Sequence, residues 1–404
     1  MDNYNNSEQV VLNAESHRDI SFIQTAGPNG IKSIFPAHQS SSHSTIETAT
    51  IIANTAVPTN IMASGGYIEF YIPMHLKTIE TLTLELILLN NTAADVALNV
   101  VWSAIDKIEY FSGSSFLGLS EQLSMYLRHS LCHSNEQINS MSRATNITSG
   151  QGTQDALFEA HTTRNMYLDV TEMLKGLCPG LLNETLRLRV HFAKEMESLT
   201  TTANAIQLTG ARVMMESVDI GAGELADLRQ VYESNKFTHR YYEARVQRVP
   251  LTIAPSSNYT ISLQNFYGNF SQLWVMVQSD IKNFLTGYFL APEIESLYIP
   301  DSANRIAQGG NVLKGDWVRF QHARSFPSSF MAQKPIYPLI SSKNAFVDLQ
   351  SGKHSGSLQL SAKGEALNFQ TTSPATATGN RVVVIIGWHA SALRVQNGNI
   401  VVLR

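Results

Sequence analysis

The stretch Thr81-Leu-Thr-Leu-Glu-Leu-Ile-Leu88 alternates leucine with polar side chains over most of its length. Successive side chains of a β-strand point to opposite faces, so this alternation predicts a strand with one face in a core. Leu186-Arg-Leu-Arg-Val-His-Phe192 repeats the pattern, with charged residues on its second face. Strands that are apolar on one face are typical of antiparallel sheets. These stretches place the first half of the chain in the all-β class.

The period of two returns in the second half of the chain. Tyr259-Thr-Ile-Ser-Leu263 alternates, and Arg381-Val-Val-Val-Ile-Ile386 consists almost entirely of β-branched residues. Asn397-Gly398 is a hairpin-turn signal before the last expected strand, Ile400–Leu403. No strand–helix–strand rhythm appears, which argues against a parallel doubly wound sheet. Two successive strand-rich blocks predict two β-sandwiches or two jelly rolls.

Helical spacing interrupts the strands at two places. Leu119, Leu123 and Leu127 recur every four residues, with Ser120 as the expected N-cap. Between Gly221 and Asn235 a second amphipathic helix is expected near the middle of the chain. Because 404 residues suit two domains rather than one core, this second helix is interpreted as the link between domains.

Charge and cysteine content exclude several classes of protein. Charged residues make up 15% of the chain and the net charge is −4, so no basic field exists to hold nucleic acid. The basic stretch His239–Arg248 is interpreted as a solvated strand or linker face. Two cysteines, Cys132 and Cys178, provide no disulfide framework and indicate synthesis in a reducing compartment. The first ten residues lack the apolar core of a signal peptide, and no apolar run is long enough to span a bilayer.

Candidate chemical motifs were weighed against plainer interpretations. Gly221-Ala-Gly-Glu-Leu-Ala226 matches a dinucleotide-binding pattern, but that pattern needs a βαβ unit, and a glycine hinge before the linker helix is favoured. His129, Cys132 and His133 have the spacing of metal ligands on a helix, but no fourth ligand is near. Glu293 and Glu295 could be a pair of glycosidase carboxylates, but neighbouring acids in a proline-containing loop are interpreted as solvated. The sequence therefore predicts no enzyme, with no catalytic residues, no metal ligands and no cofactor.

Four stretches of the second half carry a family resemblance. They are Ile294-Glu-Ser-Leu-Tyr-Ile-Pro-Asp-Ser-Ala-Asn-Arg-Ile306, Ile336–Asn344, Gln350-Ser-Gly-Lys-His-Ser-Gly-Ser-Leu-Gln-Leu360 and Trp388-His-Ala-Ser-Ala-Leu-Arg-Val-Gln-Asn-Gly398. In order and spacing they resemble the double jelly-roll major capsid proteins of tailless icosahedral viruses, including nucleocytoplasmic large DNA viruses and their smaller relatives. The resemblance implies an all-β fold of two consecutive eight-stranded antiparallel jelly rolls, with short helices in loops.

The resemblance also implies an organisation and a role. The expected parts are an N-terminal arm over 1–60, a first jelly roll over 61–222, a linker helix over 223–236 and a second jelly roll over 237–404. The expected function is a structural one in the virion capsid, assembled inside the host cell and not secreted through a signal peptide. Three chains would form a pseudo-hexameric capsomer that tiles an icosahedral shell.

The same resemblance implies partners for this role. They are further copies of the chain, penton and minor capsid proteins, and an internal membrane, with no direct specific binding of nucleic acid. The loops 130–165 and 301–335 are expected to face outward or to join neighbouring trimers.

One alternative function remains open at this point. A receptor-binding or carbohydrate-binding spike or lectin-like β-protein would expose aromatic clusters, and Tyr241-Tyr242 and Phe326–Phe330 are candidates for such clusters. The plainer interpretation is that these rings pack at a strand end or a subunit contact. A jelly-roll enzyme ranks third, because the sequence has no His-x-His pair of the kind that cupin enzymes use to bind a metal.

Overall fold

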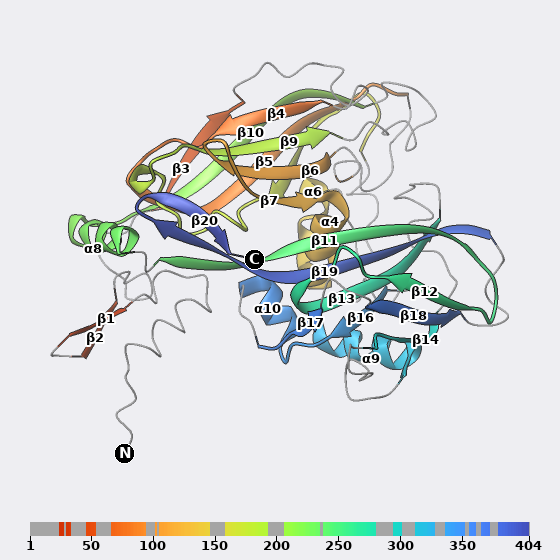
Figure 1. Cartoon of the computed structure of the whole chain (residues 1–404). Coiled ribbons are helices and arrows are strands. Elements are labelled where there is room, and N and C mark those ends of the chain that lie inside the picture. The colour runs from red at the N-terminus through yellow and green to blue at the C-terminus, as the bar shows by residue number, and fades with distance from the viewer. Residues whose placement is uncertain are drawn as a thin grey trace.

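Antiparallel β-sheets form most of the molecule, in two units that lie one above the other (Figure 1). The computed structural model describes residues 24–27, 30–33, 46–53, 66–93, 102, 105–145, 158–192, 206–234, 237–279, 294–300, 312–327, 336–351, 355–360, 365–371 and 379–403. An isolated hairpin, β1 (Gln24–Gly27) with β2 (Gly30–Ser33), falls in the expected N-terminal arm. The rest of that arm up to residue 45, and residues 54–60, lie outside the described residues.

The first unit contains two four-stranded sheets. One has the order β3-β10-β5-β8 and the other β4-β9-β6-β7. Every pairing is antiparallel. The strands are β3 (Ile46–Ile52), β4 (Tyr67–Tyr71), β5 (Lys77–Asn90), β6 (Ile105–Ser112), β7 (Ser115–Glu121), β8 (Thr163–Asp169), β9 (Leu186–Phe192) and β10 (Ile206–Asp219).

The second unit repeats this arrangement with two added strands. Its sheets have the orders β11-β19-β13-β16 and β12-β18-β14-β15, while β17 pairs with β13 and β20 with β19. The strands are β11 (Thr238–Ile253), β12 (Asn258–Ser262), β13 (Gly268–Ser279), β14 (Ile294–Tyr298), β15 (Leu313–Lys314), β16 (Ile336–Ile340), β17 (Leu358–Leu360), β18 (Ala366–Thr371), β19 (Gly379–Gln396) and β20 (Asn399–Leu403).

Both units have the strand order of a jelly roll. When β17 and β20 are set aside, one sheet of each unit contains its first, eighth, third and sixth strands in that order. The other sheet contains the second, seventh, fourth and fifth. This is the double-sheet arrangement of a jelly roll. The fold predicted from the sequence, two consecutive antiparallel jelly rolls, is confirmed, and the two units are called the first roll and the second roll below.

Helices connect several of the strands, and the positions of some differ from those expected from the sequence. They are α4 (Gln122–Cys132), α5 (Asn135–Ser140), α6 (Ser142–Thr145), the 3-10 helix η2 (Pro179–Leu181), α8 (Ala222–Glu233), α9 (Gly315–Ser325) and α10 (Ala345–Ser351). The expected helix with its N-cap at Ser120 is wrong at its start, because Leu119 and Ser120 belong to β7 and pair with β6. The expected loops 130–165 and 301–335 contain α5 and α6, and α9, respectively.

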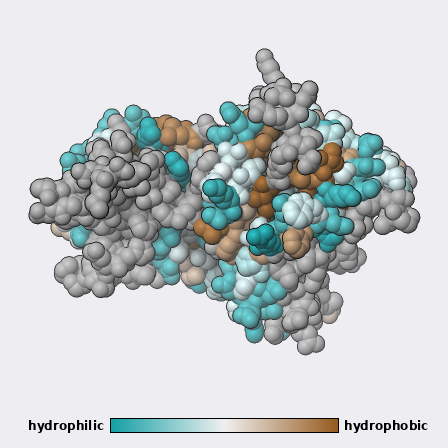
Figure 2. Space-filling view, turned by 90° about the horizontal axis from the view of Figure 1, so that it is seen from below, coloured by the Kyte–Doolittle hydropathy of each residue, from teal (hydrophilic) through white to brown (hydrophobic). Residues whose placement is uncertain are grey.

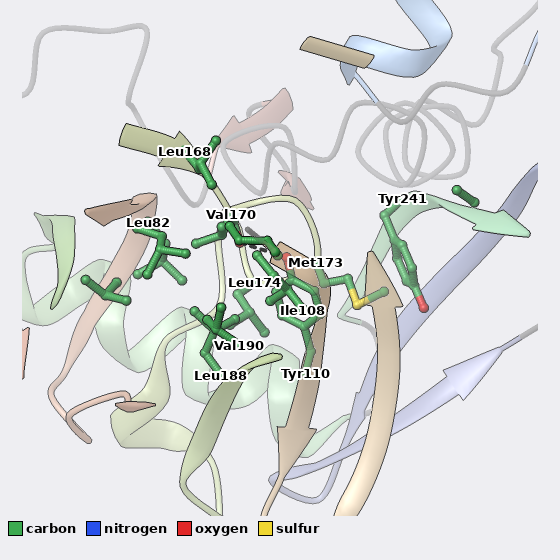
Figure 3. Packing of buried hydrophobic residues seen from close by; sticks show 14 of the residues in the cluster. Leu82, Ile108, Tyr110, Leu168, Val170, Met173, Leu174, Leu188, Val190 and Tyr241 are labelled. Atoms are coloured by element: carbon green, nitrogen blue, oxygen red, sulfur yellow. Dashed lines mark hydrogen bonds between the residues drawn. The ribbon is translucent and has the colours of Figure 1, made fainter. Parts of the chain in front are cut away.

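Alternation along the strands builds two cores. Leu82, Leu84, Leu86 and Leu88 of β5 are fully buried inside the first roll, as their period predicts. Figure 3 shows part of this core, including Leu82, Ile108, Leu168 and Val190. A second buried cluster fills the second roll. Residues of this second core include Leu273, Val275, Val277, Val383 and Ile385.

The helix α8 follows β10 and leads to β11, in the place where a linker helix is expected. Gly221 is its N-cap residue, with an ordinary φ of −60°, and contributes no side-chain cap. Its preceding strand, β10, is antiparallel to both of its neighbours, so the local structure is not the parallel βαβ unit of a dinucleotide site. The exact boundaries of the four expected segments stay a prediction.

Candidate assembly surfaces

The junction between the rolls buries the outer face of one sheet. Along β13, Leu273 and Val275 point into the second core, whereas Trp274 and Met276 point the other way and belong to the buried cluster of the first roll. Trp274 packs against Trp388 of β19, with ring centroids 5.1 Å apart and an interplanar angle of 64°. The second roll therefore uses both faces of its sheet β11-β19-β13-β16, one for its own core and one for the first roll.

The first roll meets this face with α4 and the segment after β8. Leu127 and Leu131 of α4 are fully buried in the same cluster as Trp388. Figure 3 shows Met173 reaching from the core of the first roll toward Tyr241 of β11. Both Met173 and Tyr241 are 1% exposed. The junction thus continues the apolar core of the first roll, and its burial stabilises one relative placement of the two rolls.

Polar groups line a cavity of about 450 Å³ at this junction. Arg128 of α4 forms an ion pair with Glu172, and its second amino group donates to the backbone oxygen of Leu349 at 2.9 Å. Trp388 and Tyr242 contribute from the second roll. Removal of either partner of such an ion pair is expected to lower the stability of the protein, because the remaining charge is then partly desolvated without an opposite charge beside it.

The expected metal-ligand spacing falls in the same cavity. The ring of His129 lies 4.5 Å from the ring of His133 and 5.5 Å from that of Trp102. Burial and the neighbouring His133 lower the pKa of His129 to about 3, so its ring is neutral. Burial raises the pKa of Cys132 to about 12, which keeps the thiol protonated. Among the residues that the structure describes, no three His, Cys, Asp or Glu side chains gather around a common metal position.

Other residues singled out in the sequence are dispersed. Glu295 is exposed on β14, and Glu293 lies outside the described residues. Cys132 and Cys178 are both buried. The part of the chain that the structure describes has no helix long and apolar enough to cross a membrane.

The basic stretch His239–Arg248 lies in β11, as the strand interpretation requires. It is not uniformly solvated, because His239 is 1% exposed and its Nε2 donates to the Glu172 backbone oxygen at 3.2 Å. Tyr241 and Tyr242 are 1% and 2% exposed, so they pack at the junction of the rolls. Phe326 is 4% exposed and contacts Trp274, and residues 328–330 lie outside the described residues. The aromatic residues named for a binding module are therefore largely buried.

Exposed aromatic residues lie elsewhere, and two of the surfaces that carry them were not revealed by the sequence. On the outer face of β4-β9-β6-β7, the guanidinium of Arg189 lies 4.6 Å from the ring centre of Tyr67 and 5.0 Å from that of Phe111. Glu69 accepts hydrogen bonds from Arg187 and Arg189 in the same layer. Aromatic and arginine side chains are enriched at protein interfaces.

The second such surface is α9, whose Trp317 and Phe320 are 50% and 59% exposed with their rings stacked 5.7 Å apart. Figure 2 views the molecule from the side on which α9 lies in Figure 1, and apolar surface appears there among hydrophilic residues. A spacing of three on a helix identifies a shared face. The exposure of Trp317 and Phe320 depends on which face of α9 packs on its sheet. Val318 lies on the packed face and is buried, and the fold decides which face that is.

The C-terminal hairpin provides a further contact between the rolls. Asn397 and Gly398 have φ of 50° and 76°, as the turn between β19 and β20 requires. The Asn183 amide donates to the Asn397 backbone oxygen at 2.8 Å, and the Asn183 backbone N–H donates to Gly398 at 2.8 Å. Asn183 belongs to the first roll, so this turn ties the end of the second roll to it.

No protein-family model and no curated protein matches the sequence. Solved structures do match. The PBCV-1 virus capsid is similar with a TM-score of 0.66 at 14% identity, over 90% of this chain and 97% of that chain. The Faustovirus major capsid protein has a TM-score of 0.64 at 7% identity, over 87% and 90%. The Sputnik virophage structure has a TM-score of 0.55 at 10% identity, over 89% and 88%.

These comparisons concern the fold. Nearly the whole of each chain is superposed, so the likeness covers both rolls and their placement and not a single domain. The fold implied by the resemblance in residues 294–398, the double jelly roll, is the fold of this chain.

Proposed function

We propose that this protein is a viral major capsid protein, with a structural and not a catalytic role, and that three copies form a pseudo-hexameric capsomer. The observation that carries the proposal is the repeated strand order of the two rolls within one chain. Three such chains in a ring bring together six similar rolls. A block with nearly sixfold shape tiles an icosahedral lattice while reusing one type of contact. The likeness to capsid structures over both rolls supports the same role.

The construction of the molecule suits a building block. The two rolls share an apolar junction and a tied C-terminal turn, so they form a rigid pair. Unpaired strand edges are a risk for a protein that accumulates at high local concentration, because they can form β-sheet hydrogen bonds with other chains and cause aggregation. In the second roll, β20 pairs with the end of β19 beyond β13, and β17 pairs with the start of β13 beyond β16, so these stretches of the two central strands are paired within the chain.

The partners follow from this role. We propose contacts with neighbouring capsomers, with penton and minor capsid proteins, and with an internal membrane where the virion has one, but no direct sequence-specific contact with the genome. The arm 1–60 is the proposed means of reaching such partners. Deletion of residues 2–40 is expected to leave trimers intact and to weaken lattice assembly. Loss of the trimer itself in this variant would contradict the assignment of the arm.

The first test is the solution mass of the purified protein, by light scattering, with negative-stain images of the same sample. Three chains of 44.6 kDa give a species of about 134 kDa, and a hexagonal outline is expected. A monomer at tens of micromolar concentration, without that outline, would refute the proposal. That result would favour the alternative function, a receptor-binding or carbohydrate-binding protein, which a glycan array tests directly.

A further inference from the structure

The repeated strand order makes the two rolls comparable element by element. In chain order, the sheet β3-β10-β5-β8 of the first roll corresponds to β11-β19-β13-β16 of the second. The helix α4 follows β7, and α9 follows β15, so the two helices occupy the same place in their rolls. In Figure 1 each helix lies at the lower side of its own roll, α4 between the rolls and α9 below the second roll.

Among the described residues, one of two equivalent contacts is made within the chain, at the junction of the rolls. The outer face of β11-β19-β13-β16 is covered by the first roll, and α4 is part of the cover. The paired residues Val246, Ile386 and Trp274 form one apolar row across that face. Ile386 and Trp274 are fully buried, and Val246 packs against their cluster. This row is therefore buried at the junction of the rolls.

The corresponding face of the first roll carries a different kind of row. Ile52, Arg212, Glu85 and Tyr167 are paired across β3, β10, β5 and β8. Ile52 is 77% exposed, and the Arg212 side chain is 44% exposed while its guanidinium pairs with the Glu85 carboxylate. Tyr167 donates to the same carboxylate at 2.9 Å. The face combines exposed apolar surface with neutralised charge, which suits a contact formed after the chain has folded.

The helix that corresponds to α4 has an exposed face among the described residues. On α4, Leu123, Leu127 and Leu131 are all buried. On α9, Val318 is buried in its own roll, whereas Trp317 and Phe320 are exposed. Tryptophan is among the residues that dominate interface energetics when it becomes enclosed. Within the described residues, the sheet face and the helix face that correspond to the two sides of the junction between the rolls are therefore both exposed, and the junction shows how such faces fit.

We propose that α9 of one copy packs on the outer face of β3-β10-β5-β8 of the next copy, with Trp317 and Phe320 as its anchors. This rests on the proposed trimer and assigns its contact. The contact is heterologous, because it joins two different surfaces, and heterologous contacts close into rings when the rotation permits. The junction inside each chain and the contact between chains then alternate around a ring of six rolls. The Arg212 guanidinium offers a flat surface on which an indole ring can stack.

The tryptophans provide a direct readout. The chain has four, of which Trp102, Trp274 and Trp388 are at most 3% exposed, so Trp317 alone is open to solvent in a single subunit. The experiment is acrylamide quenching of fluorescence in the assembled trimer, compared for wild type and Trp317→Phe. If α9 is covered, both trimers are quenched equally, whereas dilution to free subunits raises quenching of the wild type about twofold or more. Stronger quenching of the wild-type trimer than of the variant trimer would overturn the proposal.

Paired substitutions test the energetic role. Trp317→Ala with Phe320→Ala is expected to weaken subunit association by about 30-fold or more, since an interface anchor contributes at least about 2 kcal/mol. The matched control is Tyr267→Ala, which removes one aromatic side chain of 53% exposure that belongs neither to α9 nor to the sheet β3-β10-β5-β8. Circular dichroism verifies that both variants fold. If the control variant dissociates while the α9 variant stays trimeric, the contact through α9 is refuted but the proposed trimer is not. A monomeric wild type would instead refute the proposed function itself.

Discussion

Acidification is expected to loosen the molecule at the junction of its rolls, through His129. This histidine lies on α4 in the inter-roll cavity, where Arg128, His133, Asp169 and Glu172 are the neighbouring titratable or charged groups. Burial, with a smaller contribution from His133, lowers its pKa to about 3 from the ordinary value of 6.5. The unfolded chain therefore binds a proton near pH 6.5, and the folded chain does so only near pH 3. The contribution of neutral His129 to stability is complete above pH 6.5 and is lost as the pH falls toward 3.

The size of the effect follows from the two pKa values. Between them, each pH unit of acidification costs about 1.4 kcal/mol, so the loss at pH 5 relative to neutral pH is roughly 2 kcal/mol. This is a substantial fraction of the stability of an ordinary domain, which is about 5–15 kcal/mol. Carboxylates elsewhere also titrate in this range, so the absolute change in stability does not isolate His129.

The assay is urea unfolding followed by tryptophan fluorescence, at fixed protein concentration and at several pH values from about 7.5 to 5. Fixed concentration matters because association contributes to apparent stability. His129→Gln removes the titrating group and keeps a polar side chain. The wild type is expected to lose roughly 2 kcal/mol more than this variant over the range. His161→Asn is the control, because His161 is exposed and its φ of 54° is one that asparagine tolerates. Equal pH dependence in the wild type and His129→Gln would refute the reasoning.

Substitutions at three other positions probe the same architecture. Leu127→Ala, in the fully buried face of α4, is expected to cost about 2–5 kcal/mol in chemical denaturation; a loss below about 1 kcal/mol would mean that the junction contributes little. Glu172→Gln strands Arg128 and is expected to cost about 2–3 kcal/mol, with Glu172→Asp closer to wild type. Gly398→Ala is expected to cost about 1–2 kcal/mol and to speed hydrogen exchange in β20, because φ is 76° and the new Cβ would lie 2.7 Å from Asn183 Oδ1; unchanged exchange would contradict the role of the turn.

Several local features were predictable from sequence because their causes are local. The leucines of Thr81–Leu88 alternate with polar residues, and a strand buries alternate side chains wherever it lies, so β5 was predicted without its partners. Asn397-Gly398 makes a tight hairpin turn because both residues adopt positive φ readily, and the hairpin of β19 and β20 is present. The order of the motifs over 294–398 indicated the double jelly roll.

The errors have an equally physical origin. Leu119 has helical spacing with Leu123, but pairing of β7 with β6 adds hydrogen bonds and burial that a spacing rule does not include, so the helix starts at Gln122. His239 was expected to be solvated because it is polar in a basic stretch. It is buried because the second roll places that end of β11 against the segment after β8.

The amino-acid sequence by itself determined that the chain is all-β, that it divides into two strand-rich halves and where several of its strands and turns lie, since side-chain periodicity and backbone preference act within a few residues. Only the tertiary structure decided which sheet face is covered and which is open. Trp274 and Trp317 are the same residue type, yet one is fully buried and the other half exposed. That difference arises from how two rolls pack across hundreds of residues of chain, and no local pattern encodes it.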